Sequence, residues 1–393
     1  MTTETRWLLP DGIDELLPDR ALPLEALRRR LLDQCATWGY RFVIPPLVEF
    51  TDSLLVGLGA DLDLMTCKFS DRASGRMLGV RADITPQVAR IDAHSLAEDG
   101  VTRLCYAGST LLSAPQSATA GRAPIQLGAE LFGSESTEAD LEVVTLLLSL
   151  LEGAGVSAPL TLDLGHIGIY DALFSGANLD PELELAIFDA LQRKSAPDLD
   201  QLAQRLDANL AQRLLQLASL HGSVEVLDRA REWFGDEPAV MAALDEVSEL
   251  IERVANTFPS VALYVDLTEL RGFRYHTGLV FAVYIEGRGS AVAKGGRYDN
   301  IGAVFGRDRP ATGFAIDLKA LVDDVAQDRI EQAPISAPHS DDPDLATAVA
   351  ALRAQGRAVA VDLEGSTESS SGARLVKVKG QWVVESSDGE ASA

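Results

Sequence analysis

Strand-like segments that follow one another through short turns constrain this chain more than any other feature. Residues 68–81 form a predicted hairpin with its turn at 71–75, and residues 278–285 and 290–293 flank the glycine-containing turn 287–289. Further strands are predicted at 42–49, 103–112, 125–132, 160–164 and 261–267, and helices at 23–38, 83–97 and 137–151. This pattern predicts an α+β fold, in which an antiparallel sheet carries helices on one face.

The chain divides into a large core and a small C-terminal piece. We assign residues 1–326 to the core, with a helical insertion at about 181–257 that is rich in Leu, Ala, Glu and Arg. Residues 327–344 are polar, contain three prolines and are predicted to be a linker. A small αβ segment is predicted at 345–385, with a hairpin turning at Lys379-Gly380, and a disordered tail at 386–393.

The charge of the chain argues against a nucleic-acid partner. The 393 residues include 59 acidic and 34 basic side chains, which give a net charge of −25. Proteins that bind nucleic acids usually neutralise phosphates with Lys and Arg. The simpler interpretation is that the charge keeps the protein soluble. The N-terminus lacks a signal-peptide pattern, and no apolar run approaches 18 residues, so we expect a cytoplasmic protein without a membrane partner.

Neither a metal nor another cofactor is predicted. The three cysteines, Cys35, Cys67 and Cys105, are far apart and form no CxxC motif. The five histidines show no metal-ligand spacing. The sequence also lacks a Gly-x-Ser-x-Gly motif or a Cys/His constellation that would indicate a nucleophile.

One strand carries polar residues on a single face. In Gln126-Leu-Gly-Ala-Glu-Leu-Phe-Gly133, strand alternation places Gln126, Gly128 and Glu130 on one side of the sheet. A glycine between two polar residues leaves room for something to lie there. The alternative is an exposed polar strand face beside a buried apolar one, and alternation alone does not separate the two.

Two further motifs are rich in glycine and arginine. Arg271-Gly-Phe-Arg-Tyr-His-Thr-Gly278 lies at a predicted strand boundary, where an exposed turn with surface ion pairs is an equally simple interpretation. Gly295-Gly-Arg-Tyr-Asp299 is similar to a glycine-rich phosphate loop, but it lacks GxxxxGK[ST]. Arg297 could equally pair with Asp299 or another acid.

Taken in order, these motifs resemble the catalytic core of histidyl-tRNA synthetase, a class II aminoacyl-tRNA synthetase. The resemblance covers about residues 9–321. It also includes Trp38-Gly-Tyr-Arg-Phe-Val-Ile-Pro-Pro46, at the dimer-interface motif, Val80-Arg-Ala-Asp-Ile-Thr-Pro86, and Pro310-Ala-Thr-Gly-Phe-Ala-Ile316 in the third class motif. It implies a class II synthetase-like antiparallel sheet flanked by helices.

The resemblance also implies a site for free histidine. Its residues would be Asp83, Thr85, Gln126, Glu130, Arg271, Tyr275 and His276. The first three would lie near the ammonium group of the ligand, Arg271 near its carboxylate, and Glu130 would face the imidazole beside Tyr275 and His276. Two positions depart from the synthetase pattern, because Asp83 replaces a glutamate and His276 replaces a tyrosine.

Two larger departures lie on the ATP side. The family holds the α-phosphate with an arginine of the second motif and the triphosphate tail with one of the third. Leu112 and Ala320 stand at these positions, with Lys319 as an imperfect substitute. Loss of one partner of a buried charge pair costs about 2–5 kcal/mol, so two such losses should abolish adenylation.

This combination is similar to the regulatory subunits of ATP phosphoribosyltransferase, which are paralogues of the synthetase in histidine biosynthesis. The resemblance implies a chain without catalysis that associates with the short catalytic subunit as hetero-octamers built on synthetase-like dimers. It implies activation of that subunit and allosteric feedback inhibition by L-histidine. The alternatives are a divergent histidyl-tRNA synthetase and a synthetase-like domain of another histidine-sensing protein.

Overall fold

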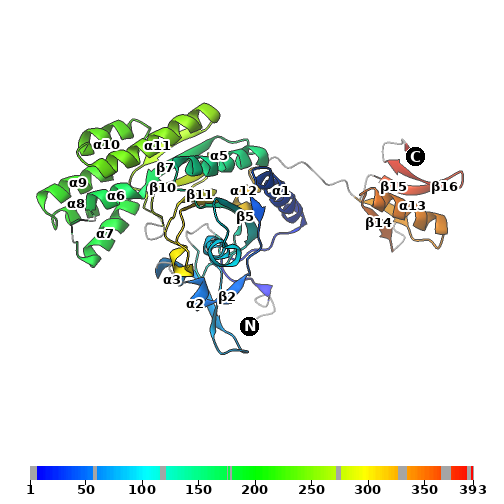
Figure 1. The fold of residues 1–393 in the computed structure, drawn as a ribbon. Coiled ribbons are helices and arrows are strands. Elements are labelled where there is room, and N and C mark those ends of the chain that lie inside the picture. Colours follow the sequence, from blue (N-terminus) through cyan, green and yellow to red (C-terminus); the bar gives the residue numbers. More distant parts are fainter. Residues whose placement is uncertain are drawn as a thin grey trace. The chain divides into compact units, whose positions relative to one another are not determined.

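The computed structural model describes residues 7–55, 60–115, 121–174, 176–177, 179–270, 276–325, 334–363, 373–386 and 391–392. The chain forms two compact units, Met1–Ala326 and Gln327–Ala393 (Figure 1). The large unit is built on a nine-stranded sheet, and the small unit on a sheet of its own.

The nine-stranded sheet confirms the predicted α+β class. Its spatial order is β1 (Arg41–Phe42), β5 (Thr102–Ser109), β6 (Ile125–Phe132), β12 (Ala311–Asp317), β11 (Ala293–Arg297), β10 (Leu279–Ile285), β7 (Leu160–His166), β9 (Ala262–Asp266) and β8 (His221–Gly222). Neighbouring strands are antiparallel except β1–β5 and β7–β9. The β7–β9 pair is parallel because the long helical segment between these strands serves as a crossover connection.

One face of the sheet is covered by long helices, namely α1 (Pro18–Thr37), α5 (Thr137–Ala154) and α11 (Pro238–Thr257), together with the short α12 (Leu318–Leu321) (Figure 1). Leu127, Ala129 and Leu131 point from β6 into this layer and are at most 1% exposed. Strand alternation therefore assigns Gln126, Gly128 and Glu130 to the opposite face of the sheet. α1 begins five residues before the predicted start, because Pro18 rather than Pro23 occupies the first helical turn.

The helical segment between β7 and β9 begins with α6 (Ile167–Phe174). It continues through α7 (Pro181–Gln192), α8 (Ala196–Ala203), α9 (Ala208–Ala218), α10 (Val226–Phe234) and α11. Asp180 caps α7 and Asp207 caps α9 through side-chain bonds to backbone N–H groups. Leucines such as Leu214 and Leu217 join the core of the sheet, so this segment is continuous with the large unit.

A second layer lies on the other face of the sheet. It contains α4 (Thr85–Arg90), a π-helical turn (Ile91–Leu96), a 3₁₀ turn (Ala303–Phe305), a three-stranded sheet of β2 (Val48–Phe50), β4 (Met77–Val80) and β3 (Cys67–Ser70), and the short helices α2 (Thr51–Leu54) and α3 (Ala60–Met65). The predicted hairpin is confirmed, and Asp71 accepts bonds from Ala73 and Ser74 in its turn. The predicted helix 83–97 changes to π-helical geometry at Ile91, where buried Asp92 pairs with Arg309 at 2.9 Å.

The small unit has a five-stranded sheet beside one helix. Its elements are β13 (Ile335–Pro338), α13 (Pro343–Ala354), β14 (Val359–Asp362), β15 (Ala373–Val378), β16 (Gln381–Ser386) and β17 (Ala391–Ser392). The linker predicted at 327–344 is wrong at 335–338, where buried Ile335 and Ala337 alternate in β13 despite the polar neighbours, and at 343–344, where α13 begins. The tail predicted at 386–393 contributes β17, which pairs with β16, and its residues 387–390 and 393 lie outside the described part.

The predicted hairpin turn of the small unit is confirmed. Lys379 and Gly380 join β15 and β16 with φ angles of 47° and 86°. Positive φ at both central residues is the geometry that matches the twist of a two-residue hairpin. Within the described ranges of both units, none of the helices combines the length and apolar composition that a membrane span needs.

We expect the buried ion pair between α5 and β11 to be a main support of the large unit. Arg297 Nη2 lies 2.8 Å from Asp140 Oδ2, and both side chains are under 10% exposed. Asp140→Ala leaves a buried guanidinium with less compensation and should lower the free energy of unfolding by about 3 kcal/mol in urea titrations. Glu138→Ala removes the exposed pair with Arg253 as a control and should cost less than about 1 kcal/mol. Equal losses in the two variants would contradict this expectation.

Candidate functional site

Four of the predicted site residues meet on the face of the sheet that carries α4. Asp83 and Thr85 lie at the start of α4. Gln126 and Glu130 lie on the same face of β6, on either side of Gly128. The structure therefore brings together Asp83, Thr85, Gln126 and Glu130, which the chain separates by up to 47 positions.

Asp83 and Gln126 join the helix to the strand. Gln126 donates from Nε2 to Asp83 Oδ1 at 2.8 Å, and Gln126 Oε1 accepts from the Ile84 backbone N–H at 2.9 Å. Asp83 Oδ1 also accepts from the Thr85 backbone N–H and hydroxyl at 3.1 and 3.2 Å. The Asp83 carboxylate thus accepts from the first backbone N–H group of α4. Asp83 and Gln126 remain partly exposed.

Glu130 is an almost completely buried carboxyl group. Its side chain accepts from the Tyr106 hydroxyl at 3.0 Å and from the Tyr298 hydroxyl, and the residue is 1% exposed. Burial raises the pKa of Glu130 to about 8, with the charge of Asp83 adding to the effect and the tyrosine hydrogen bonds opposing it. The alternative of an exposed polar strand face is therefore wrong at this position.

Tyr106 and Tyr298 were missed by the sequence analysis. Tyr106 lies on β5 directly opposite Gly128, and its hydroxyl fills the space that a Cβ atom at position 128 would need. The Glu130 carboxylate likewise lies over Gly313 of β12. Gly128 thus leaves room on its face of the sheet, as predicted, and Tyr106 of the neighbouring strand occupies that room. Tyr106 shares its face of β5 with buried Leu104, so alternation in that strand gave no signal for a polar partner.

His276 lies two strands from Glu130. Its ring covers Gly296 of β11, where an added Cβ would come within 2.7 Å of the ring Cδ2 atom. Gly296 pairs with Gly313, which pairs with Glu130. Two strand spacings separate Glu130 from Gly296 by about 10 Å, so one small amphipathic ligand could span the interval. The other two predicted residues, Arg271 and Tyr275, lie outside the described residues.

The interpretation of Gly295-Gly-Arg-Tyr-Asp299 as a phosphate loop is wrong. Its glycines lie within β11, where the Gly313 carbonyl and the Phe281 ring crowd Gly295. Arg297 bonds Asp140 and Asp299 instead of pointing to an anion site. Burial opposes ionisation of Arg297, but the two carboxylates raise its pKa overall.

The two positions that the resemblance assigns to the ATP side, Leu112 and Ala320, carry no charge. Leu112 is buried and forms a backbone bridge with Thr66. Ala320 lies in α12, whose first turn is capped by Asp317. The substitute considered from the sequence, Lys319, donates to Asp14 at 2.7 Å. Lys319 is thus already engaged by a carboxylate of the N-terminal segment.

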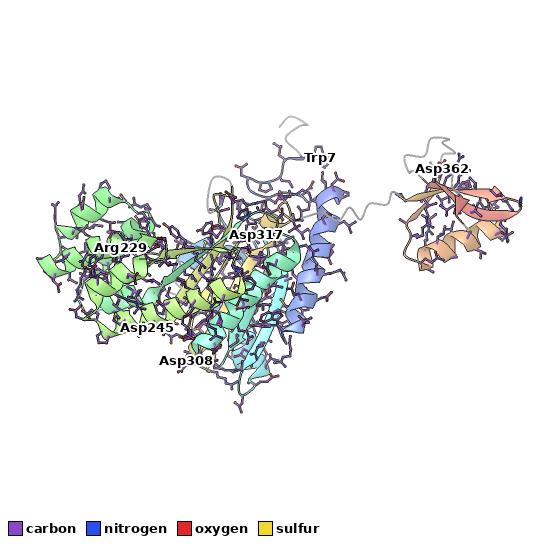
Figure 2. The ribbon with its side chains drawn as sticks, turned by 90° about the horizontal axis from the view of Figure 1, so that it is seen from above. Trp7, Arg229, Asp245, Asp308, Asp317 and Asp362 are labelled. Atoms are coloured by element: carbon purple, nitrogen blue, oxygen red, sulfur yellow. The ribbon has the colours of Figure 1, made fainter. Side chains whose placement is uncertain are left out.

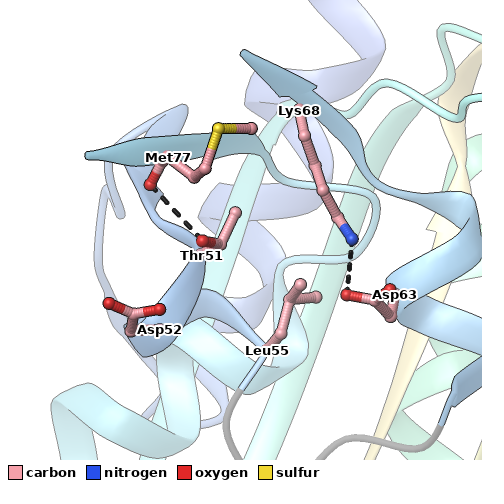
Figure 3. Close-up of a pocket in the computed structure, with 6 residues that line it drawn as sticks. All are labelled: Thr51, Asp52, Leu55, Asp63, Lys68 and Met77. Carbon is pink, nitrogen blue, oxygen red and sulfur yellow. Dashed lines mark hydrogen bonds and ion pairs between the residues drawn. The ribbon is translucent and has the colours of Figure 1, made fainter. Parts of the chain in front are cut away.

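Two other groups of charged side chains in the large unit already contain ion pairs. Asp163, Asp266 and Glu269 place carboxylate oxygens within 4.8 Å of one another, in an arrangement that could hold a metal ion. Lys194 already lies 2.6 Å from Asp266 and supplies a cation there. A surface hollow of about 390 Å³ adjoins β4. Figure 3 shows its lysine, Lys68, directed at Asp63, 2.6 Å away.

Comparison with known proteins gives two family matches. The model described as histidyl-tRNA synthetase matches residues 12–321, and the model described as ATP phosphoribosyltransferase subunit HisZ C-terminal domain matches residues 332–385. A protein of Marinobacter nauticus named ATP phosphoribosyltransferase regulatory subunit is 49% identical over 98% of this chain and 99% of its own length.

Solved structures give the same fold. A Bacillus halodurans protein titled ATP phosphoribosyltransferase regulatory subunit/histidyl-tRNA synthetase superposes with a TM-score of 0.81 at 27% identity, over 94% of this chain and 96% of that one. A chain from the ATP phosphoribosyl transferase (HisG:HisZ) complex of Thermotoga maritima reaches a TM-score of 0.57 at 20% identity, over 76% of this chain and 98% of that one. The second likeness is one of fold alone.

We expect Glu130 to make the stability of the protein depend on pH. Because its folded-state pKa of about 8 exceeds the ordinary 4.5, its contribution is fully present below pH 4.5 and is lost as the pH rises toward 8. Glu130→Gln should therefore gain stability relative to the wild type across this window, by on the order of a few kcal/mol. Urea unfolding at intervals between pH 5 and 8 measures the difference, with exposed Glu138→Gln as the control. Parallel profiles of wild type and Glu130→Gln would contradict this assignment.

Proposed function

Because this chain belongs to the family of ATP phosphoribosyltransferase regulatory subunits, we propose that it activates the short catalytic subunit of that enzyme and transmits feedback inhibition by L-histidine. The name of the 49% identical relative supports a regulatory role without catalysis of its own. Phosphoribosyl transfer to ATP, the first step of histidine biosynthesis, takes place on the partner. With this biosynthetic role we also propose a cytoplasmic location.

The observation that carries the histidine proposal is the buried Glu130 carboxyl with its two tyrosine partners. A free histidine needs a carboxylate for its imidazole, oxygen atoms for its ammonium and a cation for its carboxylate. We assign the carboxylate for the imidazole to Glu130. The oxygen atoms for the ammonium are those of Asp83, Thr85 and Gln126. We assign the third to Arg271, with Tyr275 and His276 beside the ring.

The same arrangement favours a sensor over a synthetase. Adenylation of a bound histidine requires cations around the triphosphate, and we propose that Leu112 and Ala320 mark the lost arginines. Lys319, the nearest replacement, is engaged by Asp14. A divergent histidyl-tRNA synthetase or another histidine-sensing protein remains the alternative function. The first predicts histidine-dependent exchange of pyrophosphate into ATP, and the second predicts no effect on phosphoribosyl transfer.

We also propose that the chain self-associates as a synthetase-like dimer within a hetero-octamer. Strand β1 is an edge of the nine-stranded sheet, and apolar side chains follow it along the chain. Phe42, Ile44 and Leu47 are 45%, 78% and 49% exposed. An unpaired edge bordered by exposed apolar groups is a typical site of pairing with another chain.

The test of function is phosphoribosyl transfer by the purified catalytic subunit, measured with and without this chain across a histidine titration. We expect addition of the chain to raise turnover and histidine to reverse the rise. The histidine-dependent exchange of pyrophosphate is measured in parallel and should be absent. An unchanged rate at saturating chain would exclude the regulatory proposal for this pair.

Glu130→Gln tests the position of histidine. At pH 8.5, above the Glu130 pKa of about 8, loss of the carboxylate that would accept from the imidazole N–H should weaken histidine binding to this chain by about tenfold or more in calorimetry, because a hydrogen bond to a charged group contributes about 1.5–3 kcal/mol. The inhibition curve should shift by a similar factor. Glu138→Gln, exposed on α5, is the matched control and should bind like the wild type. Unaltered binding by Glu130→Gln would move the histidine site elsewhere.

The dimer proposal predicts a change of mass. Ile44→Asp places a charge in the exposed apolar edge and should shift the chain from dimer to monomer in sedimentation velocity, since a desolvated unpaired charge is costly. Leu185→Asp on α7, also exposed at 59%, should leave the dimer intact. A monomeric wild type, or a dimeric Ile44→Asp variant, would refute the use of this edge.

A further inference from the structure

An N-terminal strap, residues 10–14, is hydrogen-bonded to Arg122 and Lys319, which neighbour Leu112 and Ala320. The Arg122 backbone N–H donates to the Gly12 carbonyl at 2.6 Å, and Lys319 donates to Asp14 at 2.7 Å. Arg122 belongs to the segment that leads into β6, and Lys319 follows the end of β12, the strand paired with β6. In Figure 2, the label Trp7 marks the chain just before the strap, and the label Asp317 marks the end of β12.

Arg122 fastens the strap beside Leu112. Its Nε donates to the Leu112 carbonyl at 2.9 Å and its Nη1 to the Asp11 carbonyl at 3.4 Å. The Leu112 N–H in turn donates to the Arg122 carbonyl at 2.8 Å. Gly12 has φ +74°, and a Cβ there would come within 2.9 Å of Arg122 Cγ. A glycine is therefore required for the strap to lie this close to the arginine.

Lys319 fastens the other end of the strap beside Ala320. Its side chain is only 15% exposed, although lysine side chains usually extend into water. Asp317, two residues earlier, places a second carboxylate at the start of α12. Lys319 thus contacts two carboxylates, because its side chain donates to Asp14 and its backbone N–H donates to Asp317. The local charge opposes the approach of a polyanion.

We propose that the N-terminal strap is a specificity element that excludes nucleoside triphosphates from the histidine-binding chain. It does so by committing the two nearby cations, Arg122 and Lys319, to its own carbonyl and carboxylate groups. This inference rests on the proposed assignment of Leu112 and Ala320 to the adenylation positions. It adds that their replacement by arginine is insufficient to restore nucleotide binding while Asp14 holds Lys319.

The test compares the binding of MgATP to three full-length variants by calorimetry. We expect Leu112→Arg/Ala320→Arg to bind weakly or not at all, and the same variant with Asp14→Ala to bind at least about tenfold more tightly, because one anion is removed and one cation is released. The matched control adds Asp323→Ala, which breaks the exposed pair with Arg20, and should leave the double variant unchanged. Equal affinity with and without Asp14, or no binding by any variant, overturns the proposal.

A second measurement uses the otherwise unaltered chain and so does not depend on the folding of the arginine variants. In Asp14→Ala, acetylation of Lys319 by an amine-reactive ester should rise several-fold in peptide mass spectrometry, with Lys68 as the internal reference. An unchanged rate at Lys319 would mean that the strap does not hold this lysine. Neither result depends on phosphoribosyl transfer, so failure of the strap proposal and failure of the regulatory proposal are distinguishable.

Discussion

The buried carboxyl group of Glu130 is the interaction on which the polar side of the large sheet depends. An acid that is 1% exposed remains tolerable only when its oxygens are hydrogen-bonded. Tyr106 from β5 and Tyr298 after β11 supply these bonds. The Tyr106 hydroxyl lies over Gly128 and the Glu130 carboxylate lies over Gly313, which explains why these two positions lack side chains. Residues of β5, β6 and β12 and the residue after β11 thus all accommodate the Glu130 carboxyl group.

Other buried charges hold the layers around this site. Asp140 and Arg297 connect α5 to β11, and Asp92 and Arg309 connect the π-helical turn to the segment before β12. Such pairs contribute little net stability compared with apolar packing, but loss of one partner is costly. They therefore determine where the elements lie rather than how strongly the chain folds. Asp83 and Gln126 extend the same principle by fixing the start of α4 against β6.

The proposed sensing role rests on two parts of the large unit, one end at Glu130 and the other at Leu112 and Ala320. At the end around Glu130, the carboxyl group and its neighbours Asp83, Thr85 and Gln126 are the groups that we assign to a bound histidine. At the other end, Leu112 and Ala320 offer no charge, and Lys319 is occupied by Asp14. Binding energy for histidine at the first end would then serve a conformational equilibrium of the assembly instead of a chemical step. The name shared by the nearly half-identical relatives agrees with this division.

Local patterns in the sequence were sufficient for the α+β class, for the hairpin turns at Asp71 and at Lys379-Gly380, and for the polar face of β6, because these depend on neighbours within a few residues. Patterns could not predict that β7 and β9 run parallel, that residues 335–338 form a strand, or that Arg297 turns away from its glycine-rich motif toward Asp140. These features depend on contacts between distant segments. The tertiary structure alone placed Tyr106 and Tyr298 on Glu130 and Asp14 on Lys319, because only folding removes these groups from water and makes each of them need a partner.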